Sequence, residues 1–207
     1  MVPRNGPPLG FDSMNEVPRH AVRPIRAEEW REVKELRLLA LKDPAAPIAF
    51  LDTYEQAAAK PDSFWQERAR GSSAGGTRVR QFVAEDGRNG AWTGTVTVLI
   101  EDAGGVDPFG TTVERRQAHV VGVFVRPEHR GSGVIDALFE AAVAWAWSVE
   151  DVTRARLYVH EDNARAERFY RRYGFTPSGQ TVPVKGDPAK VERELVLDRP
   201  RAPSGVS

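Results

Sequence analysis

The sequence predicts one domain of the mixed α/β class, in which strands and helices alternate along the chain. Two strand–turn–helix segments carry this prediction. In the first, an apolar run over 118–125 leads through glycines into a helical pattern, and in the second a shorter run over 156–159 leads through an asparagine into a one-sided helix. The length of 207 residues suits a single domain that buries its own core.

The ordered domain is expected over 21–199, between a disordered leader over 1–20, rich in Pro, Gly and Asn, and a flexible tail over 200–207. A helix over 27–41 has apolar residues near helical spacing and ends at Asp43-Pro44. The other elements expected in this half are a strand over 21–25, one or two helices over 48–60 and 63–70, and strands over 81–84 and 93–100.

The stretch 101–117, which holds Gly104-Gly105 and Asp107-Pro108, is expected to form a hairpin loop or a lid. Gly174 is expected to end the last helix in a left-handed conformation. The remaining elements are a strand over 118–125, a helix over 134–149, a strand over 156–159, a helix over 164–173 and a final strand near 191–197.

Composition excludes several functions. The 29 Lys and Arg residues are matched by 29 Asp and Glu residues, so neither nucleic acid nor a membrane is expected as a partner. The absence of cysteine rules out a disulfide framework, a cysteine-ligated zinc site and a cysteine-acyl intermediate. No metal is expected, because His129 and His160 have no partners at metal-ligand spacing. No run approaches the ~18 apolar residues of a membrane span, and no signal peptide is visible, which predicts a cytoplasmic protein.

The segment 121–135 has the features of a phosphate-binding turn. An apolar strand stops at Pro127, and glycines then lead into a helix. Glycine lets the backbone approach an anion closely, and the first N–H groups of a helix lack partners and carry the positive end of its dipole. Arg130 adds a cation beside them. Turns of this kind also arise from packing alone, so this segment is only half of the argument.

The segment 156–175 completes a pair that resembles the GNAT N-acetyltransferases. In that family the first segment, Arg/Gln-x-x-Gly-x-Gly/Ala, binds the pyrophosphate of acetyl-CoA. The second, Asn-x-x-Ala-x-x-Phe/Leu-Tyr-x-x-x-Gly-Phe, contacts pantetheine and supplies a proton donor. Ile135 departs from the small residue of the first motif, and its side chain either narrows the room for the pyrophosphate or turns into the core. The residues in matching places are Arg130, Gly133, Asn163, Ala166, Phe169, Tyr170, Gly174 and Phe175.

The resemblance implies a GNAT fold, a mixed and mostly antiparallel sheet of six to seven strands flanked by helices, with acetyl-CoA as the acyl-donor co-substrate. It also implies a bulge that splays two parallel strands, so that pantetheine pairs with the freed edge and one N–H meets the thioester oxygen. On composition alone, 123–125 is an ordinary core strand. The residues assigned to acetyl-CoA are Val123, Phe124, Val125, Arg130, Gly131, Ser132, Gly133, Val134, Ile135, Asp136, Asn163 and Tyr170.

Tyr170 is the predicted general acid, because a phenol beside the sulfur donates a proton as the thiolate leaves. The alternative is that Tyr170 belongs to the core, since it shares a helix face with Phe169 and Tyr173. Histidine titrates near neutral pH, which makes His119 a candidate general base. The other candidates for the base are Glu161, Glu101 and Asp102.

These observations predict an N-acetyltransferase that moves an acetyl group from acetyl-CoA to a primary amine by direct attack in a ternary complex. The acceptor is a small molecule or a protein amine, and a homodimer is left open. The alternative is a non-catalytic acyl-CoA-binding sensor or scaffold. Nucleic-acid binding through an arginine-rich helix is a weaker option, because the net charge is zero. The arginines concerned, expected on a solvated face or at the 3′-phosphate of CoA, are Arg154, Arg156, Arg165, Arg168, Arg171 and Arg172.

Overall fold

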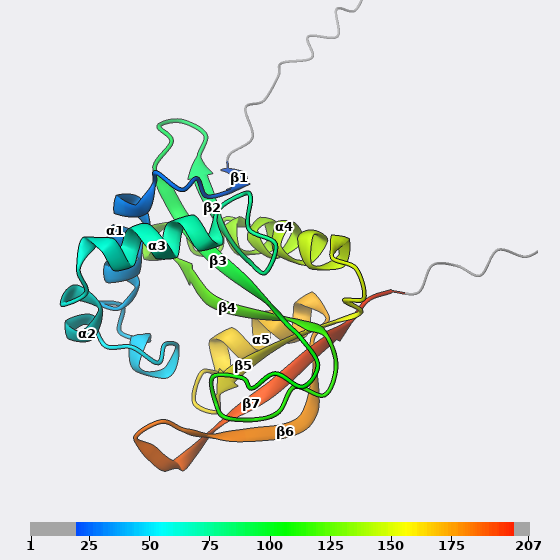
Figure 1. Ribbon diagram of the computed structural model, residues 1–207. Coiled ribbons are helices and arrows are strands. Elements are labelled where there is room, and N and C mark those ends of the chain that lie inside the picture. Colours follow the sequence, from blue (N-terminus) through cyan, green and yellow to red (C-terminus); the bar gives the residue numbers. More distant parts are fainter. Residues whose placement is uncertain (1–19, 201–207) are drawn as a thin grey trace, which may run out of the picture.

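The computed structural model describes residues 20–200, which form one seven-stranded mixed sheet with helices on both faces (Figure 1). The strand order is β1-β2-β3-β4-β5-β7-β6, and every neighbouring pair is antiparallel except β4 and β5. The predicted fold class is therefore confirmed. The strands are β1 (His20–Pro24), β2 (Val79–Asp86), β3 (Trp92–Glu101), β4 (Gln117–Val125), β5 (Arg154–His160), β6 (Thr176–Val184) and β7 (Asp187–Asp198).

The helices alternate with these strands. They are α1 (Trp30–Ala40), the 3-10 helix η1 (Ala46–Ile48), α2 (Tyr54–Ala58), α3 (Asp62–Ser72), the 3-10 helix η2 (Pro127–His129), α4 (Val134–Ser148) and α5 (Ala164–Tyr173). Residues 1–19 of the expected leader over 1–20 and residues 201–207 of the expected tail over 200–207 lie outside the described residues. His20, which we expected in the leader, is the first residue of β1. Among residues 20–200, none of the helices has the length and apolar character of a membrane span.

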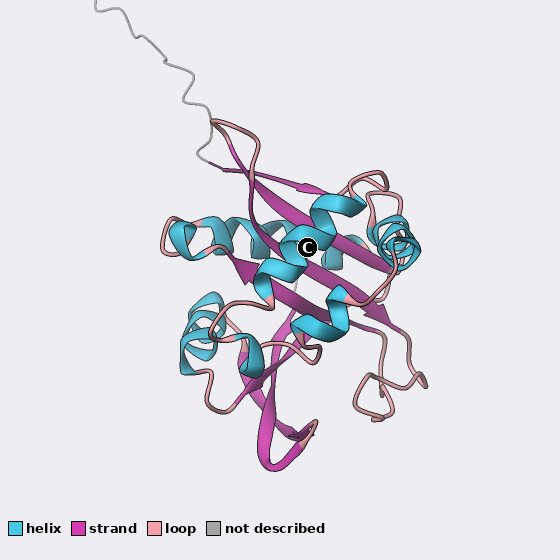
Figure 2. Cartoon of the chain, turned by 90° about the vertical axis from the view of Figure 1, so that its left-hand side faces the viewer, coloured by secondary structure: helices cyan, strands magenta, loops and turns pink. Residues whose placement is uncertain are grey.

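Two hydrophobic clusters cover the two faces of the sheet (Figure 2). One face packs against α4 and α5, where the ring of Phe139 meets those of Phe169, Tyr173 and Phe175 at centroid distances of 4.9–6.2 Å. The other face packs against α1 and α3 through buried side chains such as Trp65. Helices α4 and α5 thus cover one face of the sheet, and α1 and α3 cover the other. The central strand β4 can therefore contact side chains from both layers of helices.

Strand β4 organises the centre of the molecule. It pairs with β3 from end to end but with β5 only at Ala118 and His119, so the two parallel strands part beyond that point. In the pairing with β3, two residues of β4, Gly122 and Val123, lie opposite one residue of β3, which is a β-bulge. Gly122 has φ +63°, a left-handed conformation that glycine adopts without a Cβ penalty. The bulge and the parting strands have the arrangement that the family resemblance implies.

The structure departs from the expected secondary structure in two places. The helix expected over 48–60 is replaced by η1 and the short α2, because Thr53 and Gln56 form a capping box that starts a new helix. Strand β6, which contains Pro177 and Pro183, was not among the expected elements. Proline is tolerated there because β6 is the edge strand of the sheet.

Candidate functional site

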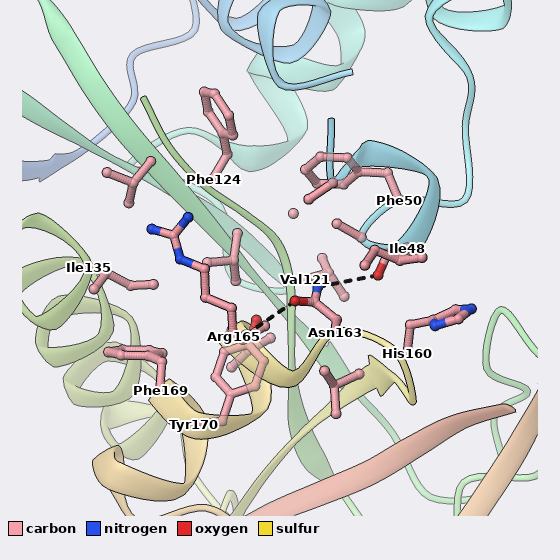
Figure 3. A pocket seen from close by; sticks show the side chains of 18 of the residues that line it. Ile48, Phe50, Val121, Phe124, Ile135, His160, Asn163, Arg165, Phe169 and Tyr170 are labelled. Carbon is pink, nitrogen blue, oxygen red and sulfur yellow. Dashed lines mark hydrogen bonds between the residues drawn. The ribbon is translucent and has the colours of Figure 1, made fainter. Parts of the chain in front are cut away.

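A cavity of about 900 Å³ lies where β4 and β5 part. Its walls come from both strands, from the turn before α4, from α5 and from the segment 43–52 that follows α1. In Figure 3, Phe50 and Ile48 lie at the upper right of this cavity, Ile135 lies at its left and Tyr170 lies below. The sequence-predicted residues of β4, Val123, Phe124 and Val125, all contribute to its lining.

The turn before α4 presents free backbone N–H groups. Gly133 caps the helix with φ +86°, without any side-chain cap. Within the described residues, no acceptor is found for the N–H groups of Gly133, Val134 or Ile135. They point outward from the positive end of a fifteen-residue helix, which suits a phosphate. Asp136, in the first turn of α4, is another predicted residue in the lining.

The predicted loop residues divide between the cavity and the core. Gly131, Gly133 and Ile135 line the cavity. Ser132 does not, and its hydroxyl donates to the carbonyl of His129 at 2.7 Å. Val134 is only 1 % exposed and belongs to the core, so it offers its N–H group and no side-chain contact. The sequence left open whether the Ile135 side chain narrows the phosphate site or turns into the core. In the structure it both borders the cavity and packs against the core.

Arg130 is held on two sides. Its Nε donates to the carbonyl of Val125 at 3.1 Å, and its terminal nitrogen pairs with the carboxylate of Asp43. Burial opposes ionisation of Asp43, but the N–H of Ala45 and the Arg130 guanidinium together lower the pKa of that carboxyl. Arg130 therefore lines the cavity as one partner of an ion pair, and no pattern in the sequence indicated Asp43 as the other partner.

Asn163 has two contacts at the start of α5. Its Oδ1 accepts from the N–H of Ala166 at 3.2 Å, which is the expected helix cap. Its Nδ2 donates to the carbonyl of Ile48 at 3.3 Å, and both bonds are drawn in Figure 3. The segment that carries Asp43 thus also meets Asn163, so both ends of η1 are tied to predicted cofactor residues.

Tyr170 belongs to the core and to the cavity at once. The residue is only 8 % exposed, and its ring contacts Phe139 and Phe175. Its hydroxyl makes no hydrogen bond to any residue in the described part of the chain, and it is not one of the buried atoms left unsatisfied, so it opens into the cavity. Burial raises the pKa of Tyr170 above its ordinary value, so the phenol stays protonated well above neutral pH. The two roles that the sequence offered for Tyr170 are compatible.

His119 lies near the point where β4 and β5 part, with only 3 % of its surface exposed. Its Nδ1 is 2.8 Å from Oε1 of Glu101. Burial disfavours the charge on Glu101, but hydrogen bonds from His119 and Arg156 lower its pKa to about 2. An ionised carboxylate only accepts, so Nδ1 of His119 is the donor, and in the neutral form of the ring Nε2 carries the lone pair. His119 lines the cavity, where this nitrogen is the one that can act as a base.

Arg156 sits behind this pair and is 3 % exposed. It donates twice to Glu101 at 2.9 Å, and also to Asp107 at 3.0 Å and Glu194 at 3.3 Å. The side chain of Asp107 is fully buried, which fixes the loop over 102–116 against the sheet. The ring of Phe109 in that loop contacts the ring of Tyr158 at a tilt of 57°, with centroids 4.6 Å apart, and both rings line the cavity. The loop is therefore a fixed wall in this structure.

The other predicted bases lie elsewhere. Glu161 is absent from the cavity lining, and its Oε1 accepts from the N–H of Val191 at 3.3 Å. Asp102 is half exposed and pairs with Arg78 at 2.6 Å and Arg116 at 3.5 Å. Of the four candidates, only His119 reaches the cavity, with Glu101 behind it.

Sequence reasoning missed His160 as a site residue. It ends β5, is 7 % exposed and lines the cavity. Its Nδ1 accepts from the N–H of Asp162 at 3.1 Å, so Nε2 carries the proton of the neutral ring. The two-residue period of a strand places Arg156, Tyr158 and His160 on one face, and this alternation was the signal available for choosing His160 over Glu161.

The arginine-rich stretch does not form one surface. Arg156 is buried, and Arg154 pairs with Glu194 at 2.9 Å, so a solvated face is wrong for these two. Arg165 and Arg168 line the cavity, and within the described residues neither has a hydrogen-bond or ion-pair partner. Figure 3 shows the Arg165 side chain extending from α5 toward the side of Ile135. Arg171 and Arg172 pair with Glu167 and Asp136.

The cavity fits acetyl-CoA in three respects. Free amides at the start of α4, beside unpaired arginines of α5, suit its phosphates. The unpaired edge of β4 offers backbone groups to pantetheine. The Tyr170 hydroxyl opens into the same space. Among residues 20–200, no three His, Asp or Glu side chains come together as a metal site.

A parting pair of parallel strands, a bulge and a glycine turn at a helix start form the arrangement that the GNAT resemblance implies. The family model described as "Acetyltransferase (GNAT) family" matches residues 26–175. The chain belongs to the GNAT acetyltransferase family. No curated protein sequence matches it significantly.

Solved structures have the same fold at low identity. NAA60 of Arabidopsis thaliana, in complex with a bisubstrate analogue, is 17 % identical with a TM-score of 0.61, over 87 % of this chain and 98 % of its own. A GCN5-related N-acetyltransferase of Kribbella flavida is 19 % identical with a TM-score of 0.59, over 87 % and 98 %. Spermidine N-acetyltransferase of Vibrio cholerae, in complex with CoA and spermine, is 15 % identical with a TM-score of 0.57, over 87 % and 96 %.

Proposed function

We propose that the protein is an N-acetyltransferase that moves an acetyl group from acetyl-CoA to a primary amine by direct attack in a ternary complex. One observation supports this above all others. A single cavity joins the free amides at the start of α4, the Tyr170 hydroxyl and the His119–Glu101 pair. We also propose a cytoplasmic location, where acetyl-CoA is available.

The proton transfers assign one role to each group. His119 Nε2 takes a proton from the incoming ammonium, because its Nδ1 proton is held by Glu101. The nitrogen then bonds to the acetyl carbon, and the carbon–sulfur bond breaks. Tyr170 donates its hydroxyl proton to the departing sulfur and recovers one from solvent. The nitrogen loses its second proton to solvent, and His119 returns the first proton to solvent. Because Tyr170 takes one proton back, one proton is released overall.

The backbone of β4 supplies the remaining contribution. Beyond His119, the edge of β4 that faces β5 is unpaired, and the bulge at Gly122 and Val123 redirects its amides. We propose that one of these N–H groups donates to the thioester oxygen as negative charge develops there. A preorganised donor of this kind is worth about 3 kcal/mol.

Release of CoA from acetyl-CoA in the presence of primary amines tests the proposal. The chain has no cysteine, so a thiol-reactive chromophore reports only the CoA that is formed. We expect amine-dependent release, together with saturable acetyl-CoA binding by calorimetry. Binding without release on any primary amine would favour the non-catalytic sensor, and the absence of binding would refute both functions.

A further inference from the structure

Glu192 places a carboxylate in the cavity that is unpaired among residues 20–200. It lies on β7 directly opposite His160 of β5 and contributes to the cavity lining. Within the described residues its carboxylate forms neither a side-chain hydrogen bond nor an ion pair. Two carboxylates in the same region do have partners. Glu194 pairs with Arg154 and Arg156, and Glu161 accepts a hydrogen bond from the N–H of Val191.

The surroundings make this isolation costly. Glu192 is half-buried, and burial raises its pKa, although the nearby imidazoles of His160 and His119 oppose that shift. A carboxylate removed from water needs a counter-charge, and no arginine or lysine among residues 20–200 supplies one. A cationic group that enters the cavity would supply it.

The charges of the cavity differ between its two ends. The end at α4 and α5 has four guanidinium groups and two carboxylates, from Arg130, Arg165, Arg168, Arg172, Asp43 and Asp136. At the end near His119, Glu192 is the carboxylate in the lining. Behind the lining, three carboxylates pair with two guanidinium groups. The carboxylates belong to Glu101, Asp107 and Glu194, and the guanidinium groups to Arg154 and Arg156. On the wall formed by α1 and α3, Arg37 and Arg68 accompany Asp52. One end therefore suits phosphates and the other suits a cation.

Apolar surface accompanies the carboxylate at this end. Phe109, Tyr158, Ile48 and Phe50 line the cavity. Figure 3 shows the His160 imidazole across Asn163 from Ile135 and the Arg165 guanidinium, so the histidine lies away from the phosphate-binding end. A charged head on a short hydrocarbon chain fits a carboxylate framed by such side chains.

We propose that Glu192 binds the ammonium group of the acceptor, and that the acceptor is a primary alkylamine that is positively charged at neutral pH. The inference depends on the proposed acetyltransferase function and narrows its substrate class. Glu192 holds the nitrogen beside His119, which takes the proton, and selects cationic amines over neutral ones.

Steady-state kinetics of the full chain and of Glu192→Gln test this assignment. The probes are butylamine, 1,5-diaminopentane and benzylamine, which are ammonium ions at pH 7, and aniline, which is neutral. We expect Glu192→Gln to raise KM for the alkylamines about tenfold or more and to leave KM for acetyl-CoA within about twofold. The constants for aniline should change little. Glu140→Gln is the matched control, because Glu140 is exposed on α4 and outside the cavity lining.

Three results would overturn the assignment. Unchanged alkylamine KM in Glu192→Gln would remove Glu192 from acceptor binding. A lower kcat at unchanged KM would make Glu192 a base and not an ammonium site. If no alkylamine is acetylated, calorimetry of the acetyl-CoA complex with 1,5-diaminopentane decides, and heats equal in the wild type and Glu192→Gln would refute the proposal. Failure of the acetyltransferase function is distinguishable, because acetyl-CoA itself would then give no heat or no turnover.

Discussion

The guanidinium of Arg130 is paired with the carboxylate of Asp43, eighty-seven positions earlier in the chain. Arg130 is the cation of the predicted pyrophosphate site, and Asp43 begins the segment that also meets Asn163 through the carbonyl of Ile48. The charge of Arg130 is therefore already balanced by Asp43 when a phosphate approaches. The phosphate and the Asp43 carboxylate compete for the Arg130 guanidinium.

Asp43→Asn should strengthen acetyl-CoA binding about three- to tenfold, because it removes a negative charge beside the phosphates and frees the charge of Arg130. The amide oxygen of the substituted side chain can still accept from the N–H of Ala45, as Asp43 does at 2.9 Å, so the segment should keep its shape. Calorimetric titration with acetyl-CoA measures the change.

The control for this change is Asp62→Asn, which removes a carboxylate that pairs with Lys34 outside the cavity. Its affinity for acetyl-CoA should equal that of the wild type. Weaker binding in Asp43→Asn would instead mean that Asp43 orients Arg130 for the phosphates.

Tyr170→Phe should lower kcat about a hundredfold and leave the Kd for acetyl-CoA within about twofold, because only the proton donor is removed. The ring remains, so its contacts with Phe139 and Phe175 and the melting temperature should persist. Stopped-flow turnover with a primary amine, together with calorimetry, separates the two constants. Equal turnover in Tyr170→Phe would exclude the phenol as the acid.

Local patterns in the sequence predicted the elements around the cofactor with little error. The helix over 164–173 has its expected bounds, Asn163 caps it and Gly174 ends it with φ +118°. These features depend on a few neighbouring residues, which is why they are visible in the sequence. The strand β6 escaped prediction, because proline disfavours a strand everywhere except at an edge, and edge position is a property of the whole sheet.

The acceptor side of the site could not be predicted in the same way. Glu192 and His160 come from separate strands and meet only through the topology of the sheet. At the phosphate-binding end, Asp43 likewise meets Arg130 from a distant part of the chain. Arg156 looked like part of a solvated cluster, and the structure buries it among three carboxylates from β3, β7 and the loop between β3 and β4. An ion pair between residues far apart in the sequence leaves no pattern among neighbouring residues. The partners of these charged side chains therefore could not be predicted from the sequence.

Gly122→Ala should lower the free energy of unfolding by about 1 kcal/mol, because an alanine at φ +63° takes up a left-handed conformation. The added Cβ would lie 3.7 Å from Oγ1 of Thr97, an ordinary contact, so steric clash adds nothing. Relief of the strain would flatten the bulge, and acetyl-CoA binding should weaken. Urea unfolding and calorimetry measure both effects.

Gly71→Ala is the matched control for the bulge, since Gly71 lies in α3 without a positive φ and with open space around it. It should be neutral or stabilising. If Gly122→Ala binds acetyl-CoA like the wild type, the bulge does not shape the site.

Glu101 should dominate the acid sensitivity of this end of the sheet. Its pKa is about 2 in the folded protein against an ordinary 4.5, so its stabilising contribution is complete above pH 4.5 and is lost as the pH falls toward 2.

Glu101→Gln leaves Arg156 with less counter-charge and should cost about 3 kcal/mol at neutral pH. The variant should also lose less stability than the wild type between pH 4.5 and 2, as urea unfolding at several pH values would measure. At pH 7 its turnover should fall at least tenfold, because Nδ1 of His119 loses the carboxylate that fixes its proton. Glu140→Gln should keep the wild-type acid profile, and an equally steep profile in Glu101→Gln would assign the acid sensitivity to other carboxylates.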